Sequence, residues 1–126
     1  MFNPSQLINA CCDLLAVKKP VEIRLRTHAR KSEKGLAGFC EPRFRNKKIT
    51  GYVIVVNLIT VVESDYSLAD VIAHEICHCA QFEHGIFDEN HHHDKRFQML
   101  CKILEKNLKK LGYPVGKLYN KKVDTD

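Results

Sequence analysis

The residues of this chain best suited to chemistry are two histidines four positions apart, His74 and His78, with Glu75 directly after the first. On an α-helix, four residues turn through about 400° and rise about 6 Å, so both imidazoles lie on one face. Two imidazoles in that arrangement can bind one Zn²⁺, and a glutamate about 100° around the helix can reach a water on the ion. The pattern H-E-x-x-H therefore predicts a catalytic zinc site with Glu75 as its general base.

The motif is short and needs support from its surroundings. With 7 histidines among 126 residues, composition alone produces H-E-x-x-H in roughly two such sequences in a hundred. A catalytic zinc also requires a third protein ligand and an open position for water. The chain must therefore supply a helix that carries the motif, a third ligand, and a fold that holds both.

Strong signals for the start of a helix precede the motif. Ser67 and Asp70 form the S-x-x-D pattern of a capping box, in which each side chain accepts a hydrogen bond from the other residue's backbone. The two histidines and the glutamate project from one side of the expected helix. The other side is an apolar stripe, formed by Leu68, Ile72, Ile76, Cys79 and Ala80. The motif is therefore expected on a helix whose core face is separate from its chemical face.

Two histidines compete for the third ligand position. His84 lies ten residues after His74, the spacing of H-E-x-x-H-x-x-G-x-x-H, but Gln81 occupies the position of the required glycine. His93 lies at the expected start of a later amphipathic helix, with Phe97 one turn further on. A ligand there would hold the ion between two rigid elements. From these residues alone, both candidates stay open.

The remaining pattern predicts an α+β fold. Residues 4–17 are expected to form an N-terminal helix, since Asn3 suits its N-cap and Pro4 its first position. A polar loop at 83–93 and a last amphipathic helix from about Asp94 to Leu111 follow the motif. This last helix and the motif helix are expected to sandwich the zinc site. Alternating or β-branched stretches predict a small, mostly antiparallel three-stranded sheet, formed by residues 21–26, 39–45 and 52–58.

The composition is typical of a single globular domain, with 44% hydrophobic and 28% charged residues. No apolar run is long enough to span a membrane, and residues 1–6 lack the features of a signal peptide. The six cysteines contain no C-x-x-C pair, which favours reduced thiols over a disulfide framework. We therefore expect an intracellular monomer, cytoplasmic or in the nucleoid or nucleus, that does not bind membranes.

Charge is segregated along the chain, although the net charge is only +5. Residues 18–48 hold eleven Lys or Arg and three acids, and residues 95–122 hold nine and one. Residues 49–94 contain no Lys or Arg and eight acids. Such blocks commonly mark solvated faces. The alternative is that two basic flanks converge on a polyanion such as DNA or RNA, and leave the central segment for chemistry.

The order of these features resembles that of the SprT-like (Spartan-like) zinc metalloproteases. Helix, small sheet, H-E-x-x-H helix, loop and an H-x-x-x-F sequence opening a further helix follow one another in the same order. The resemblance covers about residues 5–112 and includes the family's G-x-C hairpin at Gly38-Phe39-Cys40 and its apolar strand at Ile54-Val55-Val56-Asn57.

The resemblance assigns roles to individual residues. It implies that His74, His78 and His93 are the zinc ligands, that Glu75 is the catalytic glutamate, and that Phe97 is the family's aromatic residue. The glycine that follows the third histidine in the family is Asp94 here. The third position therefore keeps three alternatives, His91, His92 and His84. The side chain that stabilises the oxyanion is not identified, with His91, His92 and Tyr66 as candidates.

A function follows from the same resemblance. It implies a SprT-like metallopeptidase domain at 1–112 and a basic, irregular tail at 113–126. It implies a zinc endopeptidase of the gluzincin or zincin type that cuts DNA-associated or DNA-crosslinked proteins, with single-stranded or damaged DNA as a partner. An exposed sheet edge could hold the substrate by strand addition. Two alternatives are a nucleic-acid-binding or regulatory protein with a non-proteolytic zinc site, and a zinc peptidase that cleaves a soluble regulator.

Overall fold

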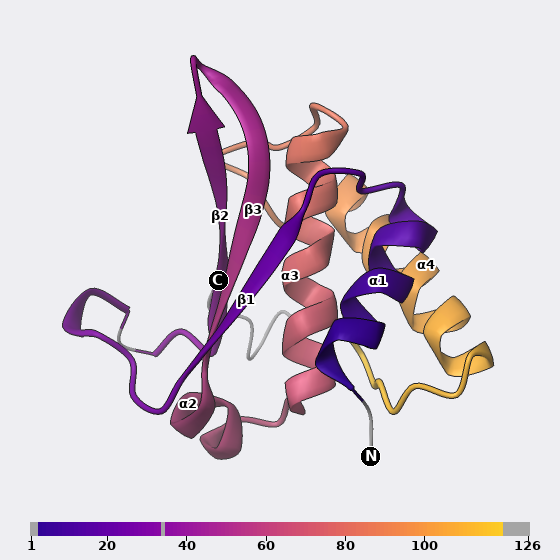
Figure 1. Cartoon of the computed structure of the whole chain (residues 1–126). Coiled ribbons are helices and arrows are strands. Elements are labelled where there is room, and N and C mark those ends of the chain that lie inside the picture. Colours follow the sequence, from indigo (N-terminus) through magenta and orange to yellow (C-terminus); the bar gives the residue numbers. More distant parts are fainter. Residues whose placement is uncertain (1–2, 34, 120–126) are drawn as a thin grey trace.

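The computed structural model describes residues 3–33 and 35–119. Figure 1 shows α3 between the sheet on one side and α1 with α4 on the other. The predicted α+β class is confirmed. Within the described residues the elements are α1 (Pro4–Leu15), β1 (Val21–Arg26), the 3₁₀ turn η1 (Lys31–Glu33), β2 (Gly38–Arg45), β3 (Lys48–Asn57), α2 (Leu58–Glu63), α3 (Leu68–Glu83) and α4 (Lys95–Lys110).

Helix α1 begins as its sequence predicts. The Asn3 side chain accepts hydrogen bonds from the N–H groups of Ser5 and Gln6, at 2.8 and 3.3 Å. The helix ends at Leu15, two residues earlier than expected, because Ala16 adopts a left-handed conformation with φ 55°. Its buried face packs against α3 and α4. That face consists of Leu7, Ile8, Cys11 and Leu15.

The sheet is mixed rather than mostly antiparallel. Strand β3 lies in the centre, antiparallel to β2 and parallel to β1. Asn46 and Lys47, with φ 52° and 65°, form the tight turn of the β2–β3 hairpin, so β3 begins at Lys48 and not at residue 52. The hairpin leaves the other edge of β3 to β1. The long connection from 27 to 37 lets β1 run in the same direction as β3.

Helix α2 is absent from the sequence prediction, which extended the third strand to residue 58. Ile59, Thr60 and Val62 favour strands locally. However, the pairing of β3 with β1 ends at Asn57 and its pairing with β2 ends at Val56, so these residues have no neighbouring strand to pair with. The chain turns there, and the Ile59 N–H donates to the Thr27 carbonyl at 3.1 Å. Tertiary position therefore overrides local propensity in this short segment.

Helix α3 starts with the predicted capping box. The Asp70 N–H donates to Ser67 Oγ, and the Ser67 N–H donates to Asp70 Oδ2, each at 3.1 Å. The helix is buried from Ala69 to Gln81. Its histidine face, expected to be apart from the core, is therefore buried as well, because the other helices and the sheet surround it. Among the described residues, no helix has the length and apolar character needed to cross a bilayer.

The segment after α4 is irregular. Residues 113–119 form no helix or strand. They are nevertheless well packed, since Val115 is 7% exposed and Leu118 is fully buried. The rest of the expected tail, 120–126, lies outside the described residues.

Candidate metal centre

Helix α3 and the turn before α4 bring His74, His78 and His93 together. One ring nitrogen of each lies within 4.8 Å of the others, and the Nε2 atoms of His78 and His93 are 3.2 Å apart. A tetrahedral ion with metal–nitrogen bonds of about 2.0–2.1 Å would hold two such atoms about 3.3 Å apart. In the described part of the chain, these three side chains are close enough together to hold a metal ion.

The rings of both motif histidines are oriented through Nδ1. His74 Nδ1 lies 2.7 Å from the carbonyl oxygen of Leu118, and His78 Nδ1 lies 2.7 Å from Gln81 Oε1. Both oxygens only accept hydrogen bonds, so each Nδ1 carries the proton and each Nε2 presents its lone pair. The Gln81 Nε2 amide donates in turn to the His92 carbonyl at 2.7 Å. This hydrogen bond orients the amide so that its oxygen, and not its nitrogen, faces His78. Two neutral imidazoles directed in this way fit a metal ion.

Phe97 forms an apolar floor under the cluster. Its ring stacks on His78, with centroids 4.4 Å apart and an interplanar angle of 22°. The His74 and His93 rings lie 5.0 and 4.8 Å from it. Because Phe97 is fully buried, it excludes water from this side and restricts the orientation of all three imidazoles.

Glu75 is buried beside the histidines, with 1% of its surface exposed. The start of β2 approaches it closely at Gly38. A Cβ atom there would come within 2.8 Å of Val71 Cγ1 and 3.0 Å of the Val55 carbonyl oxygen, and within 3.6 Å of Glu75 Cγ. Glycine therefore lets the sheet edge lie against α3 next to the carboxylate. A carboxylate fixed at the edge of a metal site can serve as a general base.

The other candidate ligands lie elsewhere or beside the cluster. His84 caps the end of α3, with Nε2 2.7 Å from the Leu15 carbonyl oxygen. His91 is exposed, and its Nδ1 is 3.7 Å from an Asp88 carboxylate oxygen. His92 is adjacent, with its ring centroid 4.3 Å from that of His93 and 5.7 Å from that of His78. Tyr66, suggested for oxyanion stabilisation, precedes α3 and packs against the core.

Two groups that orient the histidines were not predicted from the sequence. Gln81 could have been found, because it lies three residues after His78 and so on the same face of the helix. The Leu118 carbonyl could not, because any residue has a carbonyl and Leu118 is 44 positions away from His74.

The cysteines do not join the cluster. All six are free thiols. Burial raises the pKa of Cys77 and that of Cys79 well above the ordinary thiol value. These two neighbours of the motif therefore remain protonated thiols at neutral pH, and thiols bind metal ions through their deprotonated form.

A sequence model of the SprT-like family matches residues 13–117. The matched segment includes Glu75, the three clustered histidines and most of the irregular segment after α4. Comparisons with curated proteins and with solved structures find no match.

Proposed function

This chain belongs to the SprT-like family, and from that premise we propose that it is a zinc-dependent endopeptidase. The observation that carries the proposal is the convergence of His74, His78 and His93 beside the buried carboxylate of Glu75. SprT-like domains are commonly of the metallopeptidase type. Three imidazoles that leave a fourth position open are a donor set suited to catalytic Zn²⁺.

The chain's own residues supply the proton transfers. Bound zinc would polarise a scissile carbonyl and make a water molecule acidic near neutral pH. Glu75 then accepts the proton of the attacking water and delivers it to the nitrogen of the leaving amine. The Leu118 carbonyl and Gln81 hold the His74 and His78 rings through their Nδ1 protons during these steps.

The substrate would bind along β2. In the described part of the chain this strand is an edge of the sheet, and its first residue, Gly38, lies against α3 beside Glu75. An extended peptide added to that edge would form backbone hydrogen bonds with β2 and would pass close to the carboxylate.

Replacement of Glu75 by glutamine tests the proposed reaction. The amide has nearly the same shape but cannot accept the proton, so we expect unchanged zinc content and a loss of peptide cleavage of about 10²–10⁴-fold. Zinc is measured by elemental analysis, and cleavage is measured on an unfolded protein substrate. Glu89→Gln, in the exposed loop, is the matched control and should retain full activity.

Two outcomes would overturn the proposal. Undiminished cleavage by Glu75→Gln would remove Glu75 from the reaction. A wild-type chain that binds zinc but cuts no substrate would favour the alternative of a non-proteolytic metal site.

We also propose single-stranded DNA as a partner, held by the β2–β3 hairpin. Residues 42–50 contain four cations and no acid, and the Phe44 side chain at the tip is 62% exposed. Cations that neutralise phosphates, next to an exposed ring on which a base can stack, suit a single strand. The second basic block, on α4, lies across α3 from the hairpin (Figure 1). The hairpin and α4 are therefore separated by α3.

A further inference from the structure

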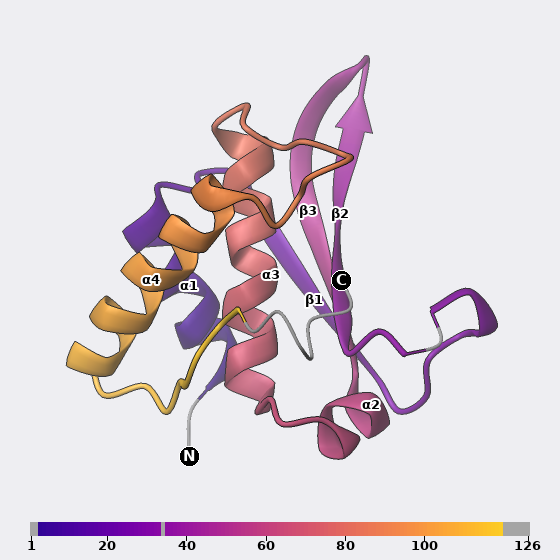
Figure 2. The same ribbon diagram turned by 180° about the vertical axis from the view of Figure 1, so that it is seen from behind.

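The segment from Tyr113 to Tyr119, here called the strap, runs from the end of α4 back to α3 (Figure 2). It has no regular secondary structure, so its backbone groups need partners outside a helix or sheet. The Tyr113 N–H donates to the Leu108 carbonyl of α4 and the Val115 N–H to the Tyr113 carbonyl. Two carboxylates and the His74 side chain pair with Gly116 and Leu118. The strap is therefore held by the same elements that carry the histidine cluster.

Three hydrogen bonds connect the strap to side chains of α3 and α4. The Gly116 N–H donates to Asp70 Oδ1 at 2.7 Å, and the Leu118 N–H donates to Glu105 Oε1 at 2.6 Å. The Leu118 carbonyl accepts from His74 Nδ1 at 2.7 Å. Asp70 uses its other oxygen for the capping box of α3. Leu118 is thus held through its N–H by a carboxylate on α4, while its carbonyl orients a histidine on α3.

We propose that Glu105 is a positioning residue of the metal centre and acts on His74 through the backbone of Leu118. The inference rests on the proposed function, because it takes His74 to be a ligand. A hydrogen bond to a charged acceptor is stronger than one between neutral groups, so Glu105 is the main polar anchor of this residue. The anchored carbonyl keeps the proton of His74 on Nδ1 and directs Nε2 toward the cluster.

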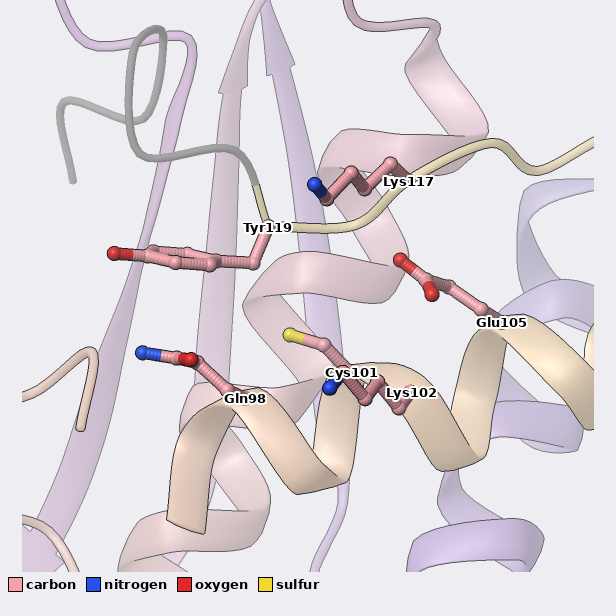
Figure 3. Close-up of a pocket in the computed structure, with 6 residues that line it drawn as sticks. All are labelled: Gln98, Cys101, Lys102, Glu105, Lys117 and Tyr119. Carbon is pink, nitrogen blue, oxygen red and sulfur yellow. The ribbon is translucent and has the colours of Figure 1, made fainter. Parts of the chain in front are cut away.

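The surroundings of Glu105 allow it to be tested by substitution. Figure 3 shows its side chain rising from α4 toward the strap near Lys117. With Cys101 and Tyr119 it lines a cavity of about 230 Å³, so a different side chain at this position has room to adjust. Leu118 is fully buried, so its apolar side chain should keep the strap attached to the core when the carboxylate is removed, while the direction of its carbonyl is no longer fixed by Glu105.

The experiment measures metal binding on the full chain. Zn²⁺ affinity is obtained by competition with a chromophoric chelator, and ligand geometry is read from the visible spectrum of the Co²⁺-substituted protein. Glu105→Leu should weaken zinc binding by about 10–100-fold, the usual effect of losing an outer partner of a histidine ligand, and should alter the Co²⁺ spectrum. Glu105→Gln keeps an acceptor oxygen but loses the charge, so its effect on both measurements should be clearly smaller than that of Glu105→Leu.

Asn107→Ala is the matched control. Asn107 lies on the same helix and donates only to the Ile103 carbonyl among its described hydrogen bonds, at 2.8 Å. The Asn107→Ala substitution changes α4 near Glu105 without touching the strap, so both metal readouts should stay at the wild-type value. Glu105→Ala, which also removes the acceptor, replaces Glu105→Leu if the leucine variant does not fold.

Three results would overturn the inference. They are wild-type affinity and spectrum in both Glu105→Leu and Glu105→Ala, an equal loss in Glu105→Gln, and an equal loss in Asn107→Ala. A wild-type chain that binds no zinc would instead refute the proposed function.

Discussion

At the scale of single residues, the two histidines of the motif are oriented by partners of different kinds. Gln81 holds His78 from one turn further along the same helix. His74 depends on a backbone carbonyl from the other end of the fold. The first interaction is local and survives wherever α3 is helical. The second exists only when the whole chain has folded.

Substitution of two histidines in one loop tests which of them is the third ligand. We expect His93→Ala to weaken zinc binding by more than the roughly 10–100-fold typical of an outer-partner change, because it removes a donor itself. His91→Ala removes the same side chain two positions away, where the ring is exposed, and should leave zinc affinity unchanged. Affinity is measured by chelator competition. Equal losses in the two variants would show that His93 is not the ligand.

At the scale of elements, Glu83 joins three parts of the fold. At the last residue of α3, its carboxylate accepts hydrogen bonds from the Tyr52 hydroxyl of β3 at 2.6 Å and from the Lys18 N–H at 2.9 Å. It also accepts one from the Lys19 ammonium at 3.1 Å. Burial alone would raise the pKa of Glu83, but these hydrogen bonds outweigh it and lower the pKa from 4.5 to about 2.

This lowered pKa predicts how stability changes with pH. A carboxyl group whose pKa is lower in the folded than in the unfolded chain stabilises the fold above pH 4.5 and loses that effect as the pH falls toward 2. We expect the Glu83 contribution to the free energy of unfolding, at most about 3 kcal/mol, to disappear over this range. Glu83→Gln should be less stable at pH 7, and its stability should depend less on pH.

Urea denaturation of metal-free protein between pH 3 and pH 7 measures this effect without interference from metal release. Glu89→Gln, in an exposed loop, serves as the control and should follow the wild-type curve. Stability curves for Glu83→Gln and wild type that run parallel across the whole range would contradict the prediction.

At the scale of the whole molecule, two elements rich in Lys and Arg, the β2–β3 hairpin and α4, lie on opposite sides of α3 (Figure 1). The β2–β3 hairpin stands away from the helices on one side of α3, and α4 lies on the other (Figures 1 and 2). A nucleic acid that contacts one basic region therefore need not contact the other. The hairpin combines four cations with an exposed ring.

Paired charge removals test which side binds DNA. We expect Arg45→Ala with Lys47→Ala to weaken binding of a single-stranded oligonucleotide and to lower the slope of its salt dependence by about 0.7 for each phosphate that is no longer neutralised. Phe44→Ala should weaken binding by about 1–3 kcal/mol, because a base can no longer stack on the ring. Lys106→Ala with Lys109→Ala removes the same charge from α4 and should have little effect. Fluorescence anisotropy over a series of salt concentrations measures all three, and an equal loss from the α4 pair would rule out the hairpin.

Local signals in the sequence determined much of this fold. The capping box at Ser67 and Asp70, the alternation at 21–26 and the amphipathic stripe after Asp94 each act within a few residues. Their helices and strands were therefore predicted within a few residues of their observed ends. The H-E-x-x-H spacing likewise required only a helix to place two imidazoles and a carboxylate together.

The tertiary structure alone decided the parts that depend on distant contacts. Strand β1 pairs in parallel with β3, and helix α2 forms in a β-branched stretch. Both depend on which parts of the chain are neighbours in space, and not on local sequence. The convergence of His93 with the motif depends on how α4 packs against α3. Leu118 reaches His74 only because the strap folds back onto the core. Backbone carbonyls carry no residue-specific signal, so no sequence pattern could reveal this last partner of the histidine cluster.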